Sequence, residues 1–393
     1  MQSVSANPGT TVIDSLRRSW WAFFVISLAS LAAAYLLLRL AWQPELAARW
    51  LVLPALTLAY LLSVLWRNLE ANHRQGESAL LPTLGWGNLL TLGRGLLTAM
   101  LLGFLGLPQP QSWLAWLPGI LYVLSDAADF FDGFVARRTN HTTRLGEIMD
   151  MSFDGLGVLA AALLSVQYGQ VPLWYLVIAL ARPLFLAGLW LRKRWQLPIY
   201  ELPPSLSRRI FAGLQMGFLA AVLLPIFSPP GTHIAAALFG LPLLAGFLRD
   251  WLYVSGALKP RQAGSATQSS AARWLPTLLR MAVLALNLPF LTAWMNGFPD
   301  QPLTLALLGG LNAILVLALF LGVMPRIAAI GALCALGFYQ MLAPLAPLQI
   351  TLALIYAAIL FVGGGAFSLW TPEETLFQRR AGEHARLEGE RSR

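Results

Sequence analysis

Apolar runs of about 20 residues recur along the whole chain, and they limit its fold more than any other feature. Each run is long enough to cross the hydrocarbon core of a bilayer, about 30 Å thick, as a helix. The composition agrees, because 57% of the 393 residues are hydrophobic and only 11% are charged. Since lipid offers no partners to an unpaired backbone, the sequence predicts an all-α fold, a polytopic helical bundle in a membrane.

About twelve transmembrane helices are expected from the apolar runs. The expected spans are residues 20–41, 50–66, 88–106, 113–136, 146–168, 172–191, 210–228, 233–255, 275–295, 303–323, 326–344 and 347–369. Arg and Lys gather in every second connection, so the positive-inside rule predicts an even number of spans and a cytoplasmic N-terminus. The net charge of +9 therefore reflects membrane topology, and we expect no nucleic-acid partner.

A polar stretch rich in Ser, Gly and Gln, residues 257–272, shows no apolar periodicity and predicts a flexible linker. It separates a longer membrane region from a shorter one. The tail after Pro372 is highly charged and is expected to be cytoplasmic. The predicted domains are an N-terminal extension with two spans (1–79), a six-span domain (80–256), the linker (257–272), a four-helix membrane domain (273–371) and the charged tail (372–393).

Four aspartates lie near the ends of two expected spans, in the segment DFFDGFVARRTNHTTRLGEIMDMSFD, residues 129–154. An ionised Asp within a span costs about 2.5–3.5 kcal/mol, so four of them require a compensating partner. Asp129 and Asp132 are one helical turn apart, and so are Asp150 and Asp154, so each pair shares one helix face. Two adjacent helices can therefore direct four carboxylates into one cleft.

The residues around these aspartates indicate what the cleft binds. Carboxylate ligands suit Mg²⁺, Mn²⁺ or Ca²⁺, and no His or Cys cluster nearby favours zinc. Gly133 and Gly146 remove side chains where a ligand approaches the backbone, and Ala136 keeps that face narrow. Arg137 offers a guanidinium to phosphate oxygens. Together these residue types indicate a site for a nucleotide pyrophosphate.

The pattern resembles the signature of the CDP-alcohol phosphotransferases, or CDP-alcohol phosphatidyltransferases, which reads D-x2-D-G-x2-A-R-x8-G-x3-D-x3-D. The chain meets every fixed position with Asp129, Asp132, Gly133, Ala136, Arg137, Gly146, Asp150 and Asp154. The resemblance implies a six-helix catalytic core within 80–256, with its active site facing the cytoplasm. We therefore expect an integral protein of the bacterial inner membrane, and a homodimer is common among members of the family.

The resemblance also implies the metal chemistry of the site. Carried over by position, Asp129, Asp132 and Asp150 would be metal ligands. Asp154 would act as the general base on the acceptor hydroxyl and would also contact the metal. The expected cofactor is Mg²⁺ or Mn²⁺, and a clamp of two ions fits four carboxylates better than one ion does.

The nucleotide would be held by neighbouring positions of the signature. Gly133, Ala136 and Gly146 would line the cytidine pocket, Arg137 would lie near the diphosphate, and Asp129 would also contact the nucleotide. Members of the family also tend to carry a segment similar to P-N-x-L-T-x-x-R at the start of the first catalytic helix.

In this chain the corresponding segment is WGNLLTLGR, with Asn88, Leu90, Thr91 and Arg94, and Gly87 replaces the proline. This partial match adds Asn88 and Thr91 to the expected nucleotide-binding residues.

Three arginines and one further aspartate are weaker candidates. Arg182, Arg208 and Arg209 resemble basic positions of the fourth and fifth catalytic helices, where they would bind a phosphate on the acceptor. A structural pairing of Arg182, and a role of Arg208 and Arg209 as positive-inside anchors, remain open. Asp126 either extends the acidic cluster or bonds a neighbouring polar group, and the second interpretation is favoured.

The implied reaction is attack by an alcohol on the phosphorus of a CDP-alcohol, with release of CMP, in phospholipid biosynthesis. The expected partners are CDP-diacylglycerol or another CDP-alcohol, an alcohol acceptor and membrane lipids. One alternative is a choline- or ethanolamine-type transferase with a soluble donor and a lipid acceptor. Another is a transporter or scaffold whose aspartates bind cations without chemistry, although the chain shows no pair of broken-helix repeats.

The C-terminal four-span block lies outside this resemblance. Its segments RIAAIGAL and GGGAFSLW loosely resemble the DoxX-like group of small four-helix membrane proteins. Close helix packing is the favoured interpretation of Gly363 to Gly365, and a topology anchor is favoured for Arg326.

Overall fold

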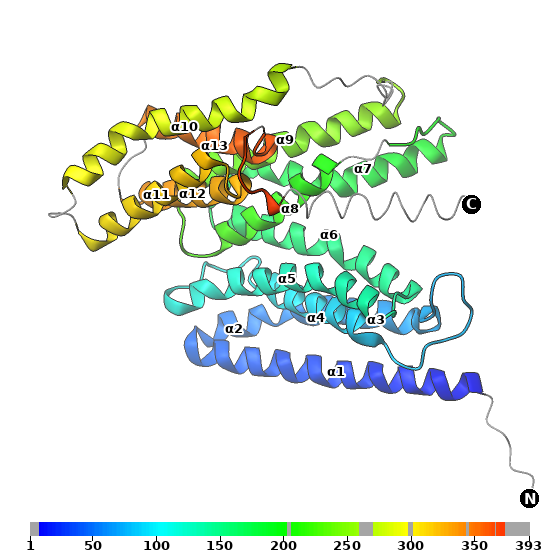
Figure 1. Cartoon of the computed structure of the whole chain (residues 1–393). Helices are drawn as coiled ribbons and strands as arrows, with labels where there is room; N and C mark the ends of the chain where they lie inside the picture. Colours follow the sequence, from blue (N-terminus) through cyan, green and yellow to red (C-terminus); the bar gives the residue numbers. More distant parts are fainter. Residues whose placement is uncertain are drawn as a thin grey trace, which may run out of the picture. The chain divides into compact units, whose positions relative to one another are not determined.

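The computed structural model describes residues 8–202, 206–258, 270–297, 302–342, 346–365 and 367–373. Within these ranges the chain forms helices joined by turns, with three isolated β-bridges and no β-strand (Figure 1). The predicted all-α fold is confirmed. Most of the predicted linker and of the charged tail lies outside the described residues.

The chain divides into two compact units. Unit 1 comprises Met1–Leu191 and Gly213–Pro229, and unit 2 comprises Arg192–Ala212 and Pro230–Arg393. This division follows the packing of the backbone and does not test the predicted domain boundaries, which remain predictions.

Unit 1 is built around one central helix. Its helices are α1 (Pro8–Ala41), α2 (Pro44–Trp50), α3 (Val52–Arg67), α4 (Gly85–Leu102), α5 (Trp116–Arg138), α6 (Arg144–Gln167), most of α7 (Leu176–Arg194) and the second part of α8 (Leu206–Leu223). Helix α4 packs against α3, α5 and α6. It approaches them closely because two glycines face its neighbours: a Cβ at Gly87 would lie 2.7 Å from the Cβ of Ala136, and one at Gly95 would lie 2.9 Å from Leu61.

Unit 2 contains α9 (Gly231–Val254), α10 (Ser270–Gly297), α11 (Leu303–Leu321), α12 (Pro325–Tyr339) and α13 (Pro347–Val362). Helices α10 to α13 form a closed group, because α10 packs against both α11 and α13, and α12 packs against the same two helices. The expected last span, 347–369, is too long. Helix α13 ends at Val362, because Gly363 and Gly365 adopt positive φ angles of 94° and 68° that leave the helix.

Eight helices of the described residues are long and apolar enough to cross a membrane. They are Thr11–Ala41, Pro44–Arg67, Ser112–Arg138, Arg144–Gln167, Leu173–Arg194, Gly231–Val254, Trp274–Gly297 and Leu303–Leu321. Three shorter apolar helices, Phe211–Leu223, Pro325–Tyr339 and Pro347–Val362, lie at other expected spans. The count of twelve is therefore not confirmed. Helix α4 is not among the eight, since its buried Asn88, Thr91, Arg94 and Thr98 make it less apolar.

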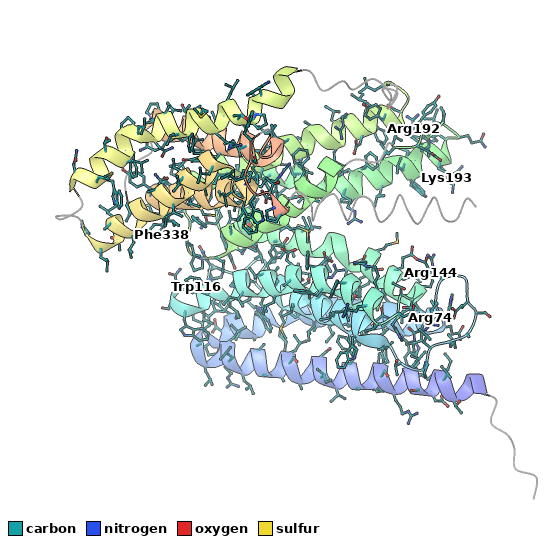
Figure 2. All side chains as sticks on the ribbon, viewed as in Figure 1. Arg74, Trp116, Arg144, Arg192, Lys193 and Phe338 are labelled. Atoms are coloured by element: carbon teal, nitrogen blue, oxygen red, sulfur yellow. The ribbon has the colours of Figure 1, made fainter. Side chains whose placement is uncertain are left out.

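The two ends of unit 1 differ in character (Figure 2). Arg74 and Arg144 lie at one end, and Trp116, which is 42% exposed, lies at the opposite end. Large apolar side chains cover the outer helix faces, as shown by Leu40 at the end of α1, which is 88% exposed. Such a surface is suited to lipid rather than to water.

Candidate functional site

Three carboxylates from two helices converge in unit 1. Asp129 and Asp132 lie one turn apart on α5, and Asp150 lies near the start of α6. One oxygen atom from each residue lies within 4.8 Å of the other two. Oxygen atoms at this spacing can ligate one divalent cation. The structure thus brings together three of the four aspartates that the sequence singled out.

Exposure changes steadily across the three carboxylates. Asp132 is only 9% exposed, whereas the side chains of Asp129 and Asp150 are 27% and 52% exposed. The cluster is therefore closed beside Asp132 and open beside Asp150. Asp126, one turn earlier on α5, does not belong to this group of three.

Arg94 of α4 lies between the carboxylates of Asp129 and Asp150. Its guanidinium pairs with Asp129 through Nη1, and its Nη2 donates to Oδ1 of Asp150 at 2.9 Å. Arg94 is 4% exposed, so its charge is almost fully removed from water. A buried guanidinium is stable only beside anions or several acceptors, and here it also relieves the repulsion between the aspartates of α5 and α6.

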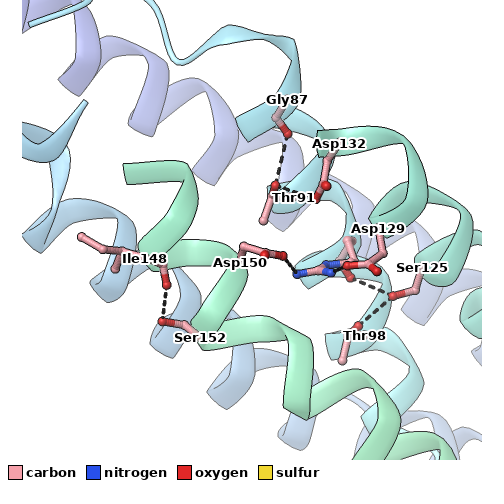
Figure 3. A network of polar contacts seen from close by, with 10 residues as sticks. Gly87, Thr91, Thr98, Ser125, Asp129, Asp132, Ile148, Asp150 and Ser152 are labelled. Carbon is pink, nitrogen blue, oxygen red and sulfur yellow. Dashed lines mark hydrogen bonds and ion pairs between the residues drawn. The ribbon is translucent and has the colours of Figure 1, made fainter. Parts of the chain in front are cut away.

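A second set of polar contacts fixes the faces of α4 and α5. Thr91 donates its hydroxyl to Oδ2 of Asp132 at 2.9 Å and also contacts the carbonyl of Gly87 at 3.2 Å (Figure 3). Thr98 and Ser125 share a hydrogen bond of 3.0 Å. These contacts hold α5 in the rotation that directs Asp129 and Asp132 toward α4 and α6.

Two of the expected nucleotide-binding residues meet at the start of α6. Asn88 donates to the hydroxyl oxygen of Thr143 at 3.0 Å, and the same oxygen accepts from the backbone N–H of Gly146 at 3.1 Å. A Cβ at Gly146 would lie 2.5 Å from Oδ1 of Asn88, so only glycine leaves room for this amide. Thr143 is thus the N-cap of α6 and the residue that links α6 to α4.

The remaining signature residues of α5 lie at its basic end. A Cβ at Gly133 would lie 3.0 Å from Nη1 of Arg137, so the guanidinium folds back along its own helix over the glycine. Arg137 is exposed and able to contact a ligand. Ala136 packs against Gly87, where α4 and α5 come closest.

Other expected site residues are not placed beside the cluster. Asp154 follows Asp150 by one turn of α6, but its side chain lies outside the described residues, as do those of Arg208 and Arg209 in α8. Arg182 is an exposed residue of α7. The roles expected for these residues therefore remain predictions.

Arg94 and Thr143 are the residues whose importance the sequence did not reveal. Arg94 appears in the sequence only as part of a partial resemblance, although a helical pattern could have found it. Asn88, Thr91, Arg94 and Thr98 recur every three or four residues on one face of an otherwise apolar run. Thr143 could have been found as a capping residue at the start of α6.

With the geometry in place, known proteins can be compared with the chain. A family model described as CDP-alcohol phosphatidyltransferase matches residues 84–256. This segment is similar to that family. It contains α4 to α9 and every residue of the aspartate cluster, so the resemblance read from the sequence is confirmed.

Relatives named for different reactions are similar to parts of the chain. Two are named CDP-diacylglycerol–glycerol-3-phosphate 3-phosphatidyltransferase: one from Bacillus subtilis, 33% identical over 18% of this chain and 36% of its own length, and one from Cereibacter sphaeroides, 26% identical over 53% and 91%. Choline/ethanolaminephosphotransferase 2 of Arabidopsis thaliana is 37% identical over 23% of this chain and 25% of its own length. The chain thus covers about a third of the Bacillus protein. No solved structure matches.

The apolar helices describe an integral membrane protein, and residues 84–256 of it match the CDP-alcohol phosphatidyltransferase model. The C-terminal four helices lie outside the matched residues, so the DoxX-like resemblance remains a prediction.

Proposed function

We propose that the chain transfers a phosphatidyl group from CDP-diacylglycerol to an alcohol acceptor, with release of CMP. The observation that carries this proposal is the convergence of three carboxylates within 4.8 Å on α5 and α6 inside the family's segment. A divalent ion bound there, Mg²⁺ or Mn²⁺, would neutralise the diphosphate and the charge that develops on CMP. Four aspartates have enough oxygen atoms to hold two such ions.

The residues of the chain then have distinct tasks. The acceptor oxygen attacks the phosphorus of the phosphatidyl group. The bond from this phosphorus to the bridging oxygen of the diphosphate then breaks, and CMP leaves with that oxygen. Asp154 accepts the proton of the acceptor hydroxyl. Asn88 and Gly146 receive the nucleotide near the start of α6, and Arg137 contacts its phosphate oxygens.

The position of the cluster supports a cytoplasmic active site. The carboxylates lie toward the end of unit 1 that carries Arg74 and Arg144 (Figure 2), and positive residues favour the cytoplasmic side. A donor whose acyl chains remain in the bilayer can then place its head group beside Asp150, the exposed member of the cluster. We place the enzyme in the inner membrane of a bacterium, as a homodimer.

A transfer of the choline or ethanolamine type is a second candidate, because the Arabidopsis relative bears that name and has 37% identity over the matched residues. In this case the donor is a soluble CDP-alcohol and the acceptor is a lipid. In the first reaction the donor is embedded in the membrane, and in the second the acceptor is. Both reactions release CMP.

The test is CMP release by the purified full-length protein in detergent with Mg²⁺ or Mn²⁺. CDP-diacylglycerol is offered with glycerol 3-phosphate, inositol phosphate or serine, and CDP-choline and CDP-ethanolamine are offered with diacylglycerol. Acceptor-dependent CMP that disappears in Asp154→Asn supports the proposal, and the productive donor decides between the candidates. If no donor yields CMP with either metal, the enzymatic proposal is wrong and a cation-binding transporter or scaffold takes its place.

A further inference from the structure

We propose that the four-helix group of unit 2, α10 to α13, binds an uncharged lipid with a hydroxyl head group. The binding site is a cavity with polar residues at its base. The cavity lies among all four helices and has a volume of about 80 Å³. A water-sized group needs roughly 10–15 Å³, so several such groups fit. This site is separate from the aspartate cluster and does not depend on the reaction proposed above.

The base of the cavity is a hydrogen-bonded set of three polar residues from three helices. Asn287 of α10 donates to the hydroxyl oxygen of Tyr356 of α13 at 3.1 Å, and Asn312 of α11 donates to Oδ1 of Asn287 at 3.3 Å. Asn287 and Tyr356 are only 2% and 1% exposed. Polar groups at such depth in a membrane domain are costly unless they are satisfied, which marks them as structural or ligand-binding.

Some of this hydrogen-bonding capacity is left for a ligand. Both amide hydrogens of Asn287 are used, because its nitrogen also donates to the carbonyl of Val283 at 2.8 Å. The hydroxyl of Tyr356 accepts from Asn287, and among the described residues no acceptor takes its proton. Asn312 lines the cavity and uses one amide hydrogen, so its second hydrogen and its oxygen remain available. The base can thus donate to and accept from one hydroxyl group.

The walls determine the rest of the ligand. Phe290, Leu308 and Leu336 line the cavity, and no charged side chain is among its lining residues. A charge placed there would lie in an apolar environment without a counterion, so the ligand is uncharged. Leu348, at the edge, is 38% exposed, so the cavity opens to the surface of the group and a hydrocarbon chain can extend from it.

The test is photolabelling of the full-length protein in lipid nanodiscs with three probes that share one hydrocarbon chain and one diazirine. They end in a hydroxyl, a carboxylate or a methyl group. We expect the alcohol to label peptides of α10 to α13 about three- to eighteenfold more strongly than either of the others, since one membrane hydrogen bond contributes about 0.6–1.7 kcal/mol. Equal labelling by all three probes would overturn the proposal.

Variants separate binding from a purely structural role. Tyr356→Phe and Asn312→Leu should reduce the preference for the alcohol to near unity, whereas Leu311→Ala, at a residue that is 45% exposed, should leave it unchanged. If the polar set only holds the helices together, the two variants lower the melting temperature and leave the probe preference as it was, which contradicts the proposal. CMP release should be the same in all three variants.

Competition identifies the source of the hydroxyl. Unlabelled diacylglycerol and an unlabelled long-chain alcohol are added separately. Competition by diacylglycerol assigns the site to a two-chain acylglycerol, and competition by the alcohol alone assigns it to a single-chain lipid. Failure of both to compete would show that the labelling is not a binding event and would reject the site.

Discussion

Each unit of the protein contains a buried arginine, and the two are held in different ways. Arg94 in unit 1 is 4% exposed and lies between the carboxylates of Asp129 and Asp150. Arg280 in unit 2 is 3% exposed and donates to the carbonyls of Leu319 and Phe320 at 2.8 and 2.7 Å. It also donates to the carbonyl of Gly364 at 2.9 Å and to the hydroxyl of Ser368 at 3.1 Å.

The difference shows how the same side chain serves function in one place and structure in the other. Main-chain carbonyls at the end of α11 are fixed dipoles, so Arg280 caps that helix and fastens the turn after α13 to it. Carboxylates carry full charges on side chains that can turn, so another cation can take over the place of Arg94. We therefore expect unit 1 to respond to divalent metal and unit 2 to be indifferent to it.

The largest effect is expected from removing one carboxylate of the cluster. Asp150→Asn deletes a negative charge that would hold the metal, and the loss of several kcal/mol of charge stabilisation should lower CMP release about a thousandfold. Glu147→Gln, an acidic residue of the same helix that pairs with Arg144, is the matched control and should retain activity. Residual activity of Asp150→Asn close to wild type would place the metal elsewhere.

Arg94→Gln should have the next largest effect, on stability without metal. Two carboxylates lose their partner, and the free energy of unfolding should fall by about 2–4 kcal/mol, less than for a fully buried pair because Asp150 is half exposed. Mn²⁺ should recover much of this loss and should bind more tightly to the variant, since a competing positive charge is gone. The measurements are thermal unfolding in detergent with EDTA or Mn²⁺, and Mn²⁺ titration. If Mn²⁺ does not recover the lost free energy of unfolding, a metal ion does not replace the charge of Arg94.

Arg280→Gln should destabilise the protein in a way that metal does not influence. The variant leaves several buried carbonyls with weaker donors, at a cost of about 2–3 kcal/mol. The same unfolding measurement should show equal deficits with EDTA and with Mn²⁺, and CMP release per folded molecule should match wild type. If the loss of unfolding free energy in Arg280→Gln depended on metal, Arg280 and Arg94 would not differ in their response to metal.

The smallest effect is expected from Gly146→Ala at the edge of the site. The new methyl group would displace the amide of Asn88, which should raise the KM for the CDP-alcohol about three- to tenfold, equivalent to about 1 kcal/mol. Gly155→Ala is the matched control on the same helix, because a Cβ there meets no atom within 4 Å. An unchanged KM in Gly146→Ala would show that Gly146 and Asn88 do not contribute to nucleotide binding.

The sequence predicted much of the site because its chemistry depends on spacing within single helices. Asp129 and Asp132 had to share a face of one helix, and a short connection had to bring the next helix alongside, so the convergence with Asp150 followed from local rules. The count of spans was less predictable. Polar residues that α4 buries against its neighbours lower its hydropathy, and the glycines after Val362 end α13 early.

By itself, the sequence determined the helical membrane class, the resemblance of residues 84–256 to the CDP-alcohol phosphatidyltransferases and the residues that carry the aspartate signature. These follow from composition, periodicity and fixed spacing, which are properties of the chain in one dimension. Only the tertiary structure decided that Arg94 stands between α5 and α6, that Arg280 fastens α11 to the turn after α13, and that Asn287, Asn312 and Tyr356 meet. Each of these contacts joins two different helices, at separations of 25 to 69 residues. The packing of whole helices, rather than any local preference, selects the partner of a buried polar group.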